Sequence, residues 1–234
     1  MSASLTIALD AMGGDNAPTI VVKGADLARR RFPDIRFHMF GDERRILPLM
    51  KRRKRLREIT EITHTEDVIS NEMKVSVALR QGRQSSMRLA INAVREGNAA
   101  GVVSAGNTGA LMAMAKLALR TLPGIDRPAI AAIFPTMRGE SVMLDLGANV
   151  ECDAENLVQF AIMGDVFART VLGTVEPSCG LLNVGSEEMK GSAEIQQASA
   201  YLKEMSDTVN FYGFVEGDDI AAGTTDVIVS DGFT

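Results

Sequence analysis

Length, composition and charge place this chain among ordinary globular proteins. It has 234 residues, 46% hydrophobic and 24% charged, and its 25 basic and 30 acidic side chains give a formal net charge of −5. These values exclude a disordered chain, a collagen-like repeat and a disulfide-dense secreted scaffold. The acidity also argues against nucleic acid as a partner, because neutralising phosphates needs a basic surface.

The cysteine count and the first residues predict a cytoplasmic protein. Cys152 and Cys179 are the two cysteines, and they form no Cys-x-x-Cys pair. The start, MSASLTIALD, lacks the basic and apolar regions of a signal peptide. The most apolar stretch, residues 101–119, is interrupted by Asn107 and Lys116, so no membrane span is predicted.

Strands and helices are predicted to alternate along the whole chain. Short runs rich in Val, Ile and Leu are each followed by a glycine or polar turn and then by a segment with helical periodicity. The expected strands are residues 5–10, 35–40, 59–62, 101–106, 127–134, 141–147, 179–185, 209–215 and 225–231. One helix is expected to start near Pro18. The other expected helices are residues 43–56, 74–80, 85–96, 108–119, 154–172 and 192–205. This alternation predicts an α/β fold with a mostly parallel sheet.

A single domain is the expected organisation. No change of composition, Pro/Ser-rich linker or internal repeat divides the chain, so we expect one α/β domain over residues 1–234. The chain ends directly after the strand expected at residues 225–231. Because a parallel strand normally leads into a covering helix, the sequence looks truncated at the C-terminus.

Glycine-containing turns follow four of the predicted strands. They are residues 9–15, 104–109, 145–149 and 183–191, and residues 230–232 look like a fifth. The carboxyl ends of parallel strands share one edge, where open α/β sheets bind their ligands. Glycine lets the backbone approach closely, and the helix N-terminus behind each turn offers free N–H groups. A glycine after a single strand more often serves only to form the turn, but the set of turns at one edge predicts an anion-binding site.

Aspartates occupy several predicted strand ends. These are Asp10, Asp15, Asp145, Asp153 and Asp231. Such carboxylates could bind Mg²⁺, act as a general base or hold loops by accepting backbone N–H bonds, and capping is favoured for Asp15 and Asp153. No Asp-x-Asp spacing occurs among these aspartates, and no metal site is predicted.

Lys190 is the candidate catalytic residue. It lies in the turn at residues 183–191, after Glu187 and Glu188. A lysine at an anion site could hold a dianion or stabilise the oxyanion formed when a nucleophile attacks a carbonyl. The alternative is a solvated loop lysine.

Other chemistry has little support in the sequence. Cys152 precedes a predicted helix but has no evident base, Cys179 is expected to be buried, and His38 and His64 are interpreted as structural or surface residues. Neither Gly-x-Gly-x-x-Gly nor a P-loop occurs, so ATP and NAD are set aside. The basic run at residues 51–55, extended by Arg57, could contact an acidic protein or anionic lipid, although a solvated helix end is commoner.

The turn motifs resemble those of the phosphate acyltransferases of bacterial phospholipid synthesis, the PlsX family. The matching motifs are ALDAMGGDNAP, SAGNTGAL, LDLGANVECD, LLNVGSEEMKG and SDGFT, with SSMRLA, GIDRPAIA and VQFAIMG between them. The resemblance implies an enzyme that transfers a fatty acyl group from acyl carrier protein to inorganic phosphate without a cofactor. It also implies a three-layer α/β/α sandwich similar to isocitrate and isopropylmalate dehydrogenases and to phosphotransacetylase. A homodimer in peripheral contact with the cytoplasmic membrane, or with the next acyltransferase of the pathway, is implied as well.

The turns and the resemblance together give the expected site. Backbone N–H groups near the glycines would hold phosphate for attack on the thioester carbonyl, and Lys190 would neutralise the oxyanion or the phosphate. The expected phosphate-binding residues are Asp10, Gly13, Gly14, Asp15, Ser104, Gly106, Asn107, Thr108, Asp145, Asn149 and Asp231.

Two other readings stay open. One keeps the fold but makes the chain a metal-dependent dehydrogenase of the isopropylmalate type, which needs a carboxylate cluster that the scattered aspartates do not suggest. The other is a non-catalytic scaffold that docks acyl carrier protein at a membrane through the basic run.

Overall fold

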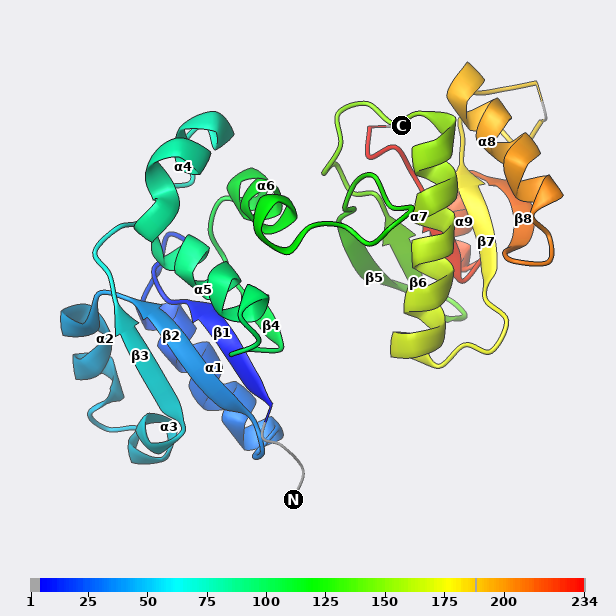
Figure 1. Ribbon diagram of the computed structural model, residues 1–234. Helices are drawn as coiled ribbons and strands as arrows, with labels where there is room; N and C mark the ends of the chain where they lie inside the picture. Colours follow the sequence, from blue (N-terminus) through cyan, green and yellow to red (C-terminus); the bar gives the residue numbers. More distant parts are fainter. Residues whose placement is uncertain (1–4, 188, 234) are drawn as a thin grey trace. The chain divides into compact units, whose positions relative to one another are not determined.

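The computed structural model describes residues 5–187 and 189–233. The chain divides into two compact units, Met1–Arg120 and Thr121–Thr234, where the sequence predicted a single domain. Figure 1 colours the first unit from blue to green and the second from green to red. Each unit has its own sheet, so the single sheet expected from the sequence is replaced by two.

The first unit is built on a parallel four-stranded sheet in the order β3-β2-β1-β4. The strands are β1 (Thr6–Asp10), β2 (Arg36–Gly41), β3 (Thr60–His64) and β4 (Gly101–Val103). Asp10 pairs with Phe40, and Leu9 pairs with Val103, so β1 lies in the middle of the sheet. The residues after β1 and β4 therefore leave the sheet side by side at its carboxyl edge.

Helices cover both faces of this sheet (Figure 1). They are α1 (Thr19–Arg31), α2 (Glu43–Met50), α3 (Lys54–Glu58), α4 (Val75–Gln81), α5 (Ser86–Arg95) and α6 (Thr108–Leu119). Side chains alternate along β1 as in any strand: Leu9 packs with Val22 and Ile46 of α1 and α2, whereas Ala8 packs with Ala90 of α5. The sheet of the first unit therefore lies between two layers of helices.

The second unit has a mixed sheet in the order β5-β6-β9-β7-β8. Its strands are β5 (Ala131–Thr136), β6 (Gly139–Leu144), β7 (Ser178–Leu182), β8 (Asn210–Val215) and β9 (Val227–Val229). Among the described strands of this unit, β5 pairs antiparallel in a hairpin with β6, and the other pairings are parallel. The prediction of an α/β fold with a mostly parallel sheet is confirmed.

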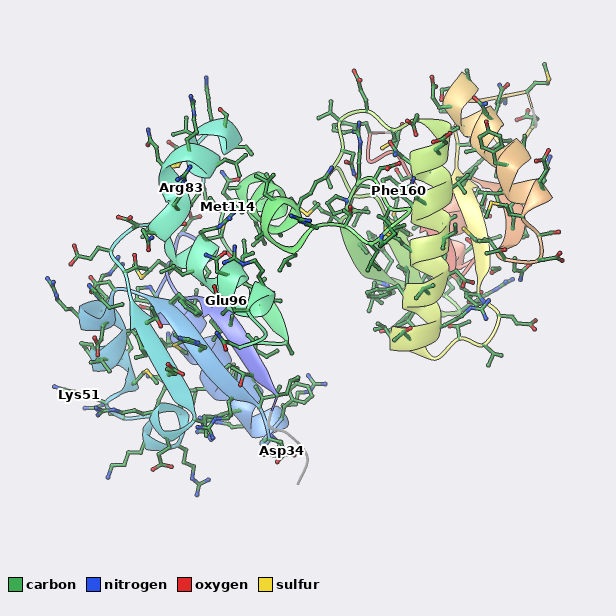
Figure 2. All side chains as sticks on the ribbon, viewed as in Figure 1. Asp34, Lys51, Arg83, Glu96, Met114 and Phe160 are labelled. Carbon is green, nitrogen blue, oxygen red and sulfur yellow. The ribbon has the colours of Figure 1, made fainter. Side chains whose placement is uncertain are left out.

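A long helix packs on the second sheet. This is α7 (Ala154–Phe167), which continues as a π-helical segment, Ala168–Leu172, and the other helices are α8 (Ala193–Glu204) and α9 (Gly217–Ala222). Phe160 of α7 is fully buried and packs in one core with Leu144 and Val227 (Figure 2). A Cβ on Gly164 would lie 2.4 Å from a methyl carbon of Val227, so the glycine lets α7 pack closely against β9. Within the described residues, no helix has both the length and the apolar character needed to span a membrane.

Candidate functional site

The predicted turns gather at the carboxyl edges of the two sheets. Residues 9–15 and 104–109 follow the neighbouring strands β1 and β4 of the first unit. Residues 145–149, 183–191 and 230–232 follow β6, β7 and β9, which are neighbours in the second unit. The prediction that the turns share an edge is therefore confirmed inside each unit, while the single edge expected from the sequence becomes two.

Asp10 ties together three elements of the first unit. Its side chain accepts hydrogen bonds from Ser86 Oγ at 2.6 Å and from Ser104 Oγ at 2.7 Å, and Met12 N donates at 3.3 Å. The residue is only 1% exposed. Because its oxygens already accept from protein donors, Asp10 positions Ser104 and the turns rather than facing a ligand. The site residues predicted from the sequence did not include Ser86, because its position in the chain does not indicate a contact with β1.

Three glycines allow the two turns of the first unit to pack together. A Cβ on Gly13 would lie 2.5 Å from Asp10 Oδ2, and Gly14 has φ +93° with its Cβ position 2.8 Å from the Ala105 carbonyl oxygen. The N–H of Gly106 donates to Ser104 Oγ at 3.1 Å. That amide is thus occupied inside the protein, so it does not offer the free donor expected from the sequence.

The first turn of α6 provides the free donors. Asn107 caps the helix, because its Oδ1 accepts from Ala110 N at 2.9 Å. Among the described residues, the backbone N–H groups of Thr108 and Gly109 have no hydrogen-bond acceptor. The N-terminus of this twelve-residue helix therefore presents two unpaired donors at the positive end of the helix dipole.

A hollow of about 430 Å³ lies beside the turn at residues 9–15, and its lining includes Asp15 and the exposed Lys23 of α1. Asp15 Oδ1 accepts from Asn71 Nδ2 at 2.8 Å, and Asn107 Nδ2 donates to the Asn71 carbonyl oxygen at 2.9 Å. Asn71 thus connects the hollow with the N-terminus of α6. Neither Asn71 nor Lys23 was among the site residues predicted from the sequence. Lys23 follows the start of α1 by one helical turn, which is the signal that could have identified it.

In the second unit, Asp145 holds its own turn. It is fully buried, and it accepts from Ile130 N at 2.8 Å, Ala148 N at 3.1 Å, Asn149 N at 2.9 Å and Asn149 Nδ2 at 3.0 Å. Four protein donors leave this carboxylate no capacity for a metal. Asp145 and Asn149, both predicted as phosphate-binding residues, contact each other in a geometry that holds the loop.

The turn that follows β9 lies against the turn that follows β6. A Cβ on Gly232 would lie 2.4 Å from the backbone nitrogen of Gly147, and Asp231 Oδ1 accepts from Phe233 N at 2.8 Å. Burial, followed by the charges of Asp145 and Asp231, raises the pKa of Cys152 to about 11. This part of the edge therefore carries negative charge, which opposes an anion. Thr234, the last residue of the SDGFT motif, lies outside the described residues.

Lys190 is paired with an acid of its own turn. Its Nζ lies 2.8 Å from Glu187 Oε2, and the side chains are 52% and 62% exposed. The hydrogen bond between them raises the pKa of Lys190 and lowers the pKa of Glu187. Asn183 Nδ2 keeps the turn closed by donating to the Lys190 carbonyl oxygen at 3.0 Å. Lys190 thus carries a stable charge within reach of solvent, and Glu188 lies outside the described residues.

The remaining titratable candidates have structural surroundings. Burial raises the pKa of Cys179 to about 12, so this thiol stays protonated. Burial lowers the pKa of His38, whose Nε2 is 2.8 Å from Thr63 Oγ1, and His64 Nδ1 accepts from Glu43 N at 3.1 Å. In the part of the chain that the structure describes, no group of three or more His, Cys, Asp or Glu side chains could hold a metal ion.

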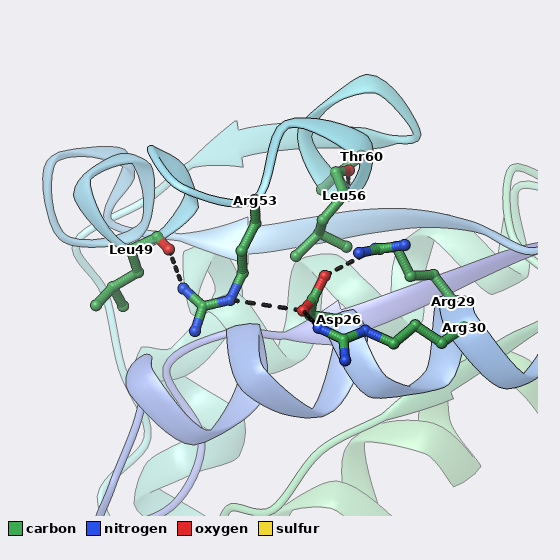
Figure 3. Close-up of polar contacts among 7 residues, drawn as sticks. All are labelled: Asp26, Arg29, Arg30, Leu49, Arg53, Leu56 and Thr60. Carbon is green, nitrogen blue, oxygen red and sulfur yellow. Dashed lines mark hydrogen bonds and ion pairs between the residues drawn. The ribbon is translucent and has the colours of Figure 1, made fainter.

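Part of the basic run is used internally. Asp26 of α1 accepts from Arg29 Nε at 2.7 Å and from Arg30 Nη2 at 2.8 Å, and Arg53 Nε lies 3.9 Å away (Figure 3). Arg53 also donates to the Leu49 carbonyl oxygen at the end of α2. Arg53 therefore fastens the α2–α3 connection to α1, while its neighbours in the run remain exposed.

Comparisons with known proteins give a consistent result. A family model described as "Fatty acid synthesis protein" matches residues 5–234. Proteins called phosphate acyltransferase from Rhodospirillum centenum and Rhodospirillum rubrum are 64% and 62% identical over 234 residues. These matches include all of this chain and 66% and 67% of the relatives, so the chain spans about two thirds of their length.

Solved structures of low identity share the fold. A phosphotransacetylase from Streptococcus pyogenes gives a TM-score of 0.72 at 14% identity, covering 99% of this chain and 78% of that one. The EutD phosphotransacetylase from Staphylococcus aureus gives a TM-score of 0.68 at 17% identity. This match covers 97% of this chain and 78% of that one. At such identities the likeness establishes the α/β fold alone.

Proposed function

Because this chain belongs to the fatty acid synthesis protein family, we propose that it transfers a fatty acyl group from acyl carrier protein to inorganic phosphate. The observation that carries this proposal is the high identity to phosphate acyltransferases along the whole chain. The metal-dependent dehydrogenase is not favoured, since Asp10 and Asp145 already accept hydrogen bonds from protein donors. The non-catalytic scaffold is not favoured either, because the relatives carry an enzyme's name.

Phosphate binds, in this proposal, at the N-terminus of α6. The N–H groups of Thr108 and Gly109 have no acceptor among the described residues, and a helix N-terminus favours a dianion. Asp10 keeps Ser104 in place, and Gly13 and Gly14 leave room for the neighbouring turn to pack. Of the phosphate-binding residues predicted from the sequence, Thr108 is the one we assign to direct contact.

The reaction is a direct displacement. An oxygen of hydrogen phosphate attacks the thioester carbonyl, the new C–O bond forms and the C–S bond breaks. The proton of the hydrogen phosphate passes to the departing thiolate, so the carrier leaves as a thiol. The carbonyl oxygen becomes negative in the transition state, and a fixed positive charge stabilises it. We assign this role to Lys190, whose pairing with Glu187 keeps it protonated at neutral pH. No cofactor or acyl-enzyme takes part.

A substitution that removes one N–H tests the phosphate site. Thr108 is the first residue of α6, where proline is tolerated, and Asn107 before it has φ −60° and ψ 110°, which suits a following proline. Thr108→Pro should raise the KM for phosphate about tenfold or more, because the substitution removes one hydrogen bond to a charged ligand. Thr108→Ala keeps the N–H and is the matched control. An unchanged phosphate KM in Thr108→Pro would remove this site from the proposal.

Lys190 is tested by the same assay of acyl phosphate formation. Lys190→Ala should lower kcat about 10²–10³-fold, as loss of an oxyanion-stabilising group does. Lys51→Ala, an exposed lysine in the other unit, serves as the control and should leave kcat unchanged. Full activity of Lys190→Ala would exclude the assigned role.

The assembly of the protein is proposed from the resemblance. We expect a homodimer in the cytoplasm that contacts the membrane, or the next acyltransferase, peripherally, and we keep the likeness to isocitrate and isopropylmalate dehydrogenases as part of the proposal. Sedimentation and vesicle flotation of the protein test these points, and a monomer that stays with the soluble fraction would contradict them.

A further inference from the structure

One segment of the first unit, residues 73–120, is strongly basic, although the chain as a whole is acidic. Residues 73–120 contain one acidic side chain, Glu96, which pairs with Arg95 at 3.1 Å. The basic residues of this segment are Lys74, Arg80, Arg83, Arg88, Arg95, Lys116 and Arg120. They lie on α4, α5, α6 and the turns beside these helices, which pack together around Met87, Ile91 and Met114. We call this surface the α4–α6 face.

A groove of about 460 Å³ runs into the α4–α6 face. Its polar lining includes Arg83, Arg88 and Asn92, and its apolar lining includes Leu79, Met114 and Leu117. Leu117 is 64% exposed, so the groove combines positive charge with apolar surface that contacts solvent. Figure 2 shows Arg83 and Met114 on this layer of helices.

The polar groups of the groove are incompletely paired. Within the described part of the chain, Arg83 has no hydrogen bond or ion pair, and Arg88 donates to the Met114 carbonyl oxygen at 3.4 Å without an acid nearby. Asn92 Oδ1 is buried and accepts no hydrogen bond from any described residue. Buried polar atoms are nearly always satisfied, so the Asn92 oxygen is open to a donor from a bound partner.

The groove lies on helices that begin at the proposed phosphate site. α5 begins at Ser86, which donates to Asp10, and α6 begins at Thr108. The other basic surface, at residues 51–55, follows the C-terminal end of α2 and lies beside Asp26 and Arg29 of α1. Those helices run antiparallel to the strands, so the second surface is at the opposite edge, about 20 Å away by the length of a six-residue strand.

We propose that an acidic carrier protein docks on the α4–α6 face through an amphipathic helix. Carboxylates of that helix pair with exposed cations such as Arg80, Arg83 and Lys116, and an apolar side chain of the same helix enters the groove between Leu79 and Leu117. A flat anionic bilayer would satisfy the charges but leave the concave groove empty. This inference rests on the proposed function, since it assigns the acyl carrier to a surface beside the proposed phosphate site.

Charge reversal on the two basic surfaces tests the docking site. Arg83→Glu removes an exposed, unpaired cation from the groove, and Arg52→Glu makes the same change at the opposite edge. Acyl phosphate formation is measured with acyl carrier protein thioester and with a carrier-free acyl pantetheine thioester. Arg83→Glu should raise the KM for the carrier substrate about tenfold at low salt, with the KM for the carrier-free substrate within twofold of wild type. Arg52→Glu should change neither, and added salt should bring wild type toward Arg83→Glu.

Several results would overturn this inference. Equal increases of the carrier KM in Arg83→Glu and Arg52→Glu would indicate a general charge effect. Loss of flotation with phosphatidylglycerol vesicles in Arg83→Glu, with an unchanged carrier KM, would assign the face to a membrane. A changed sedimentation coefficient would assign it to a second copy of the chain.

Direct binding separates this inference from the proposed function. If wild type forms no acyl phosphate from the carrier-free thioester, the proposed function fails, but binding of fluorescent carrier protein still tests the face. Weakened binding by Arg83→Glu and not by Arg52→Glu supports docking, and equal binding by both overturns it. Circular dichroism establishes that both variants are folded.

Discussion

Two buried aspartates show how single residues organise the turns. Asp10 accepts from two serine hydroxyls, and Asp145 accepts from four N–H donors around its own turn. A buried carboxylate is stable only when such donors satisfy it. Each aspartate therefore fixes the shape of a glycine turn, and the free donors for a ligand come from elsewhere, at Thr108 and Gly109.

A pair of glycine substitutions measures how closely the turns of the first unit pack. A Cβ on Gly13 would lie 2.5 Å from Asp10 Oδ2, so Gly13→Ala should destabilise the protein by about 1–3 kcal/mol and reduce phosphate-dependent turnover. Gly24 in α1 has no atom within 4 Å of its Cβ position, so Gly24→Ala should stabilise by about 0.5–1 kcal/mol. Urea unfolding gives both values. A Gly13→Ala protein as stable and active as Gly24→Ala would contradict the packing argument.

The sequence predicted the location of these turns better than their contacts. Hydrophobic runs followed by glycines placed the turn at residues 9–15 directly after β1, because strand periodicity and turn chemistry are local properties. Ser86 could not be found in this way, because it donates to a residue 76 positions away. The sequence also could not show that the Gly106 N–H is already hydrogen-bonded to Ser104, because that contact depends on the folded turn.

At the scale of elements, the connection between α2 and α3 depends on one buried acid. The sequence predicted one helix over residues 43–56, but α2 ends at Met50 and α3 begins at Lys54. Arg53, which has non-helical dihedrals, donates to the Leu49 carbonyl oxygen and lies near Asp26 of α1 (Figure 3). The hydrophobic pattern continues across the break, which coincides with Pro48 inside α2 and with the contacts of Arg53 to Leu49 and Asp26.

Asp26→Asn should weaken the packing of α1, α2 and α3. Burial opposes ionisation of Asp26, but hydrogen bonds from Arg29 and Arg30 outweigh it and hold the pKa below its usual value. Loss of the Asp26 charge from this largely buried ion pair should lower the free energy of unfolding by about 2–3 kcal/mol at pH 7. Because the folded-state pKa is lowered, the stabilisation is full above the unfolded pKa of about 4 and disappears as the pH falls through the folded value.

The pH dependence gives this prediction its control. Urea unfolding of wild type and Asp26→Asn should differ most near pH 7 and should converge as the solution becomes more acidic than pH 4. Asp34→Asn changes the same charge on an exposed residue of the same unit and should leave stability nearly unchanged. A constant difference between wild type and Asp26→Asn across this range would show that the charge of Asp26 does not matter.

At the scale of the whole molecule, two units share one pattern of elements. Both alternate strands and helices, and the segment that joins them, residues 120–130, has ordinary composition with a Leu-Pro-Gly turn. A single-domain prediction therefore had no signal to contradict it. The division is set by which strands pair, and strand order across long connections is not a local property of a sequence.

Because the hydrophobic clusters of the two units have no residue in common, we predict that core substitutions destabilise one unit at a time. Phe160 and Met39 are fully buried in different units. Phe160→Ala should cost about 3–5 kcal/mol and Met39→Ala about 2–5 kcal/mol by removing buried atoms and leaving cavities. Native-state hydrogen exchange locates the effect: Phe160→Ala should speed exchange in β6, β7 and β9, and Met39→Ala in β1 and β2. Faster exchange throughout both sheets after either substitution would show that the units unfold as one cooperative structure, because a shared core would transmit the loss.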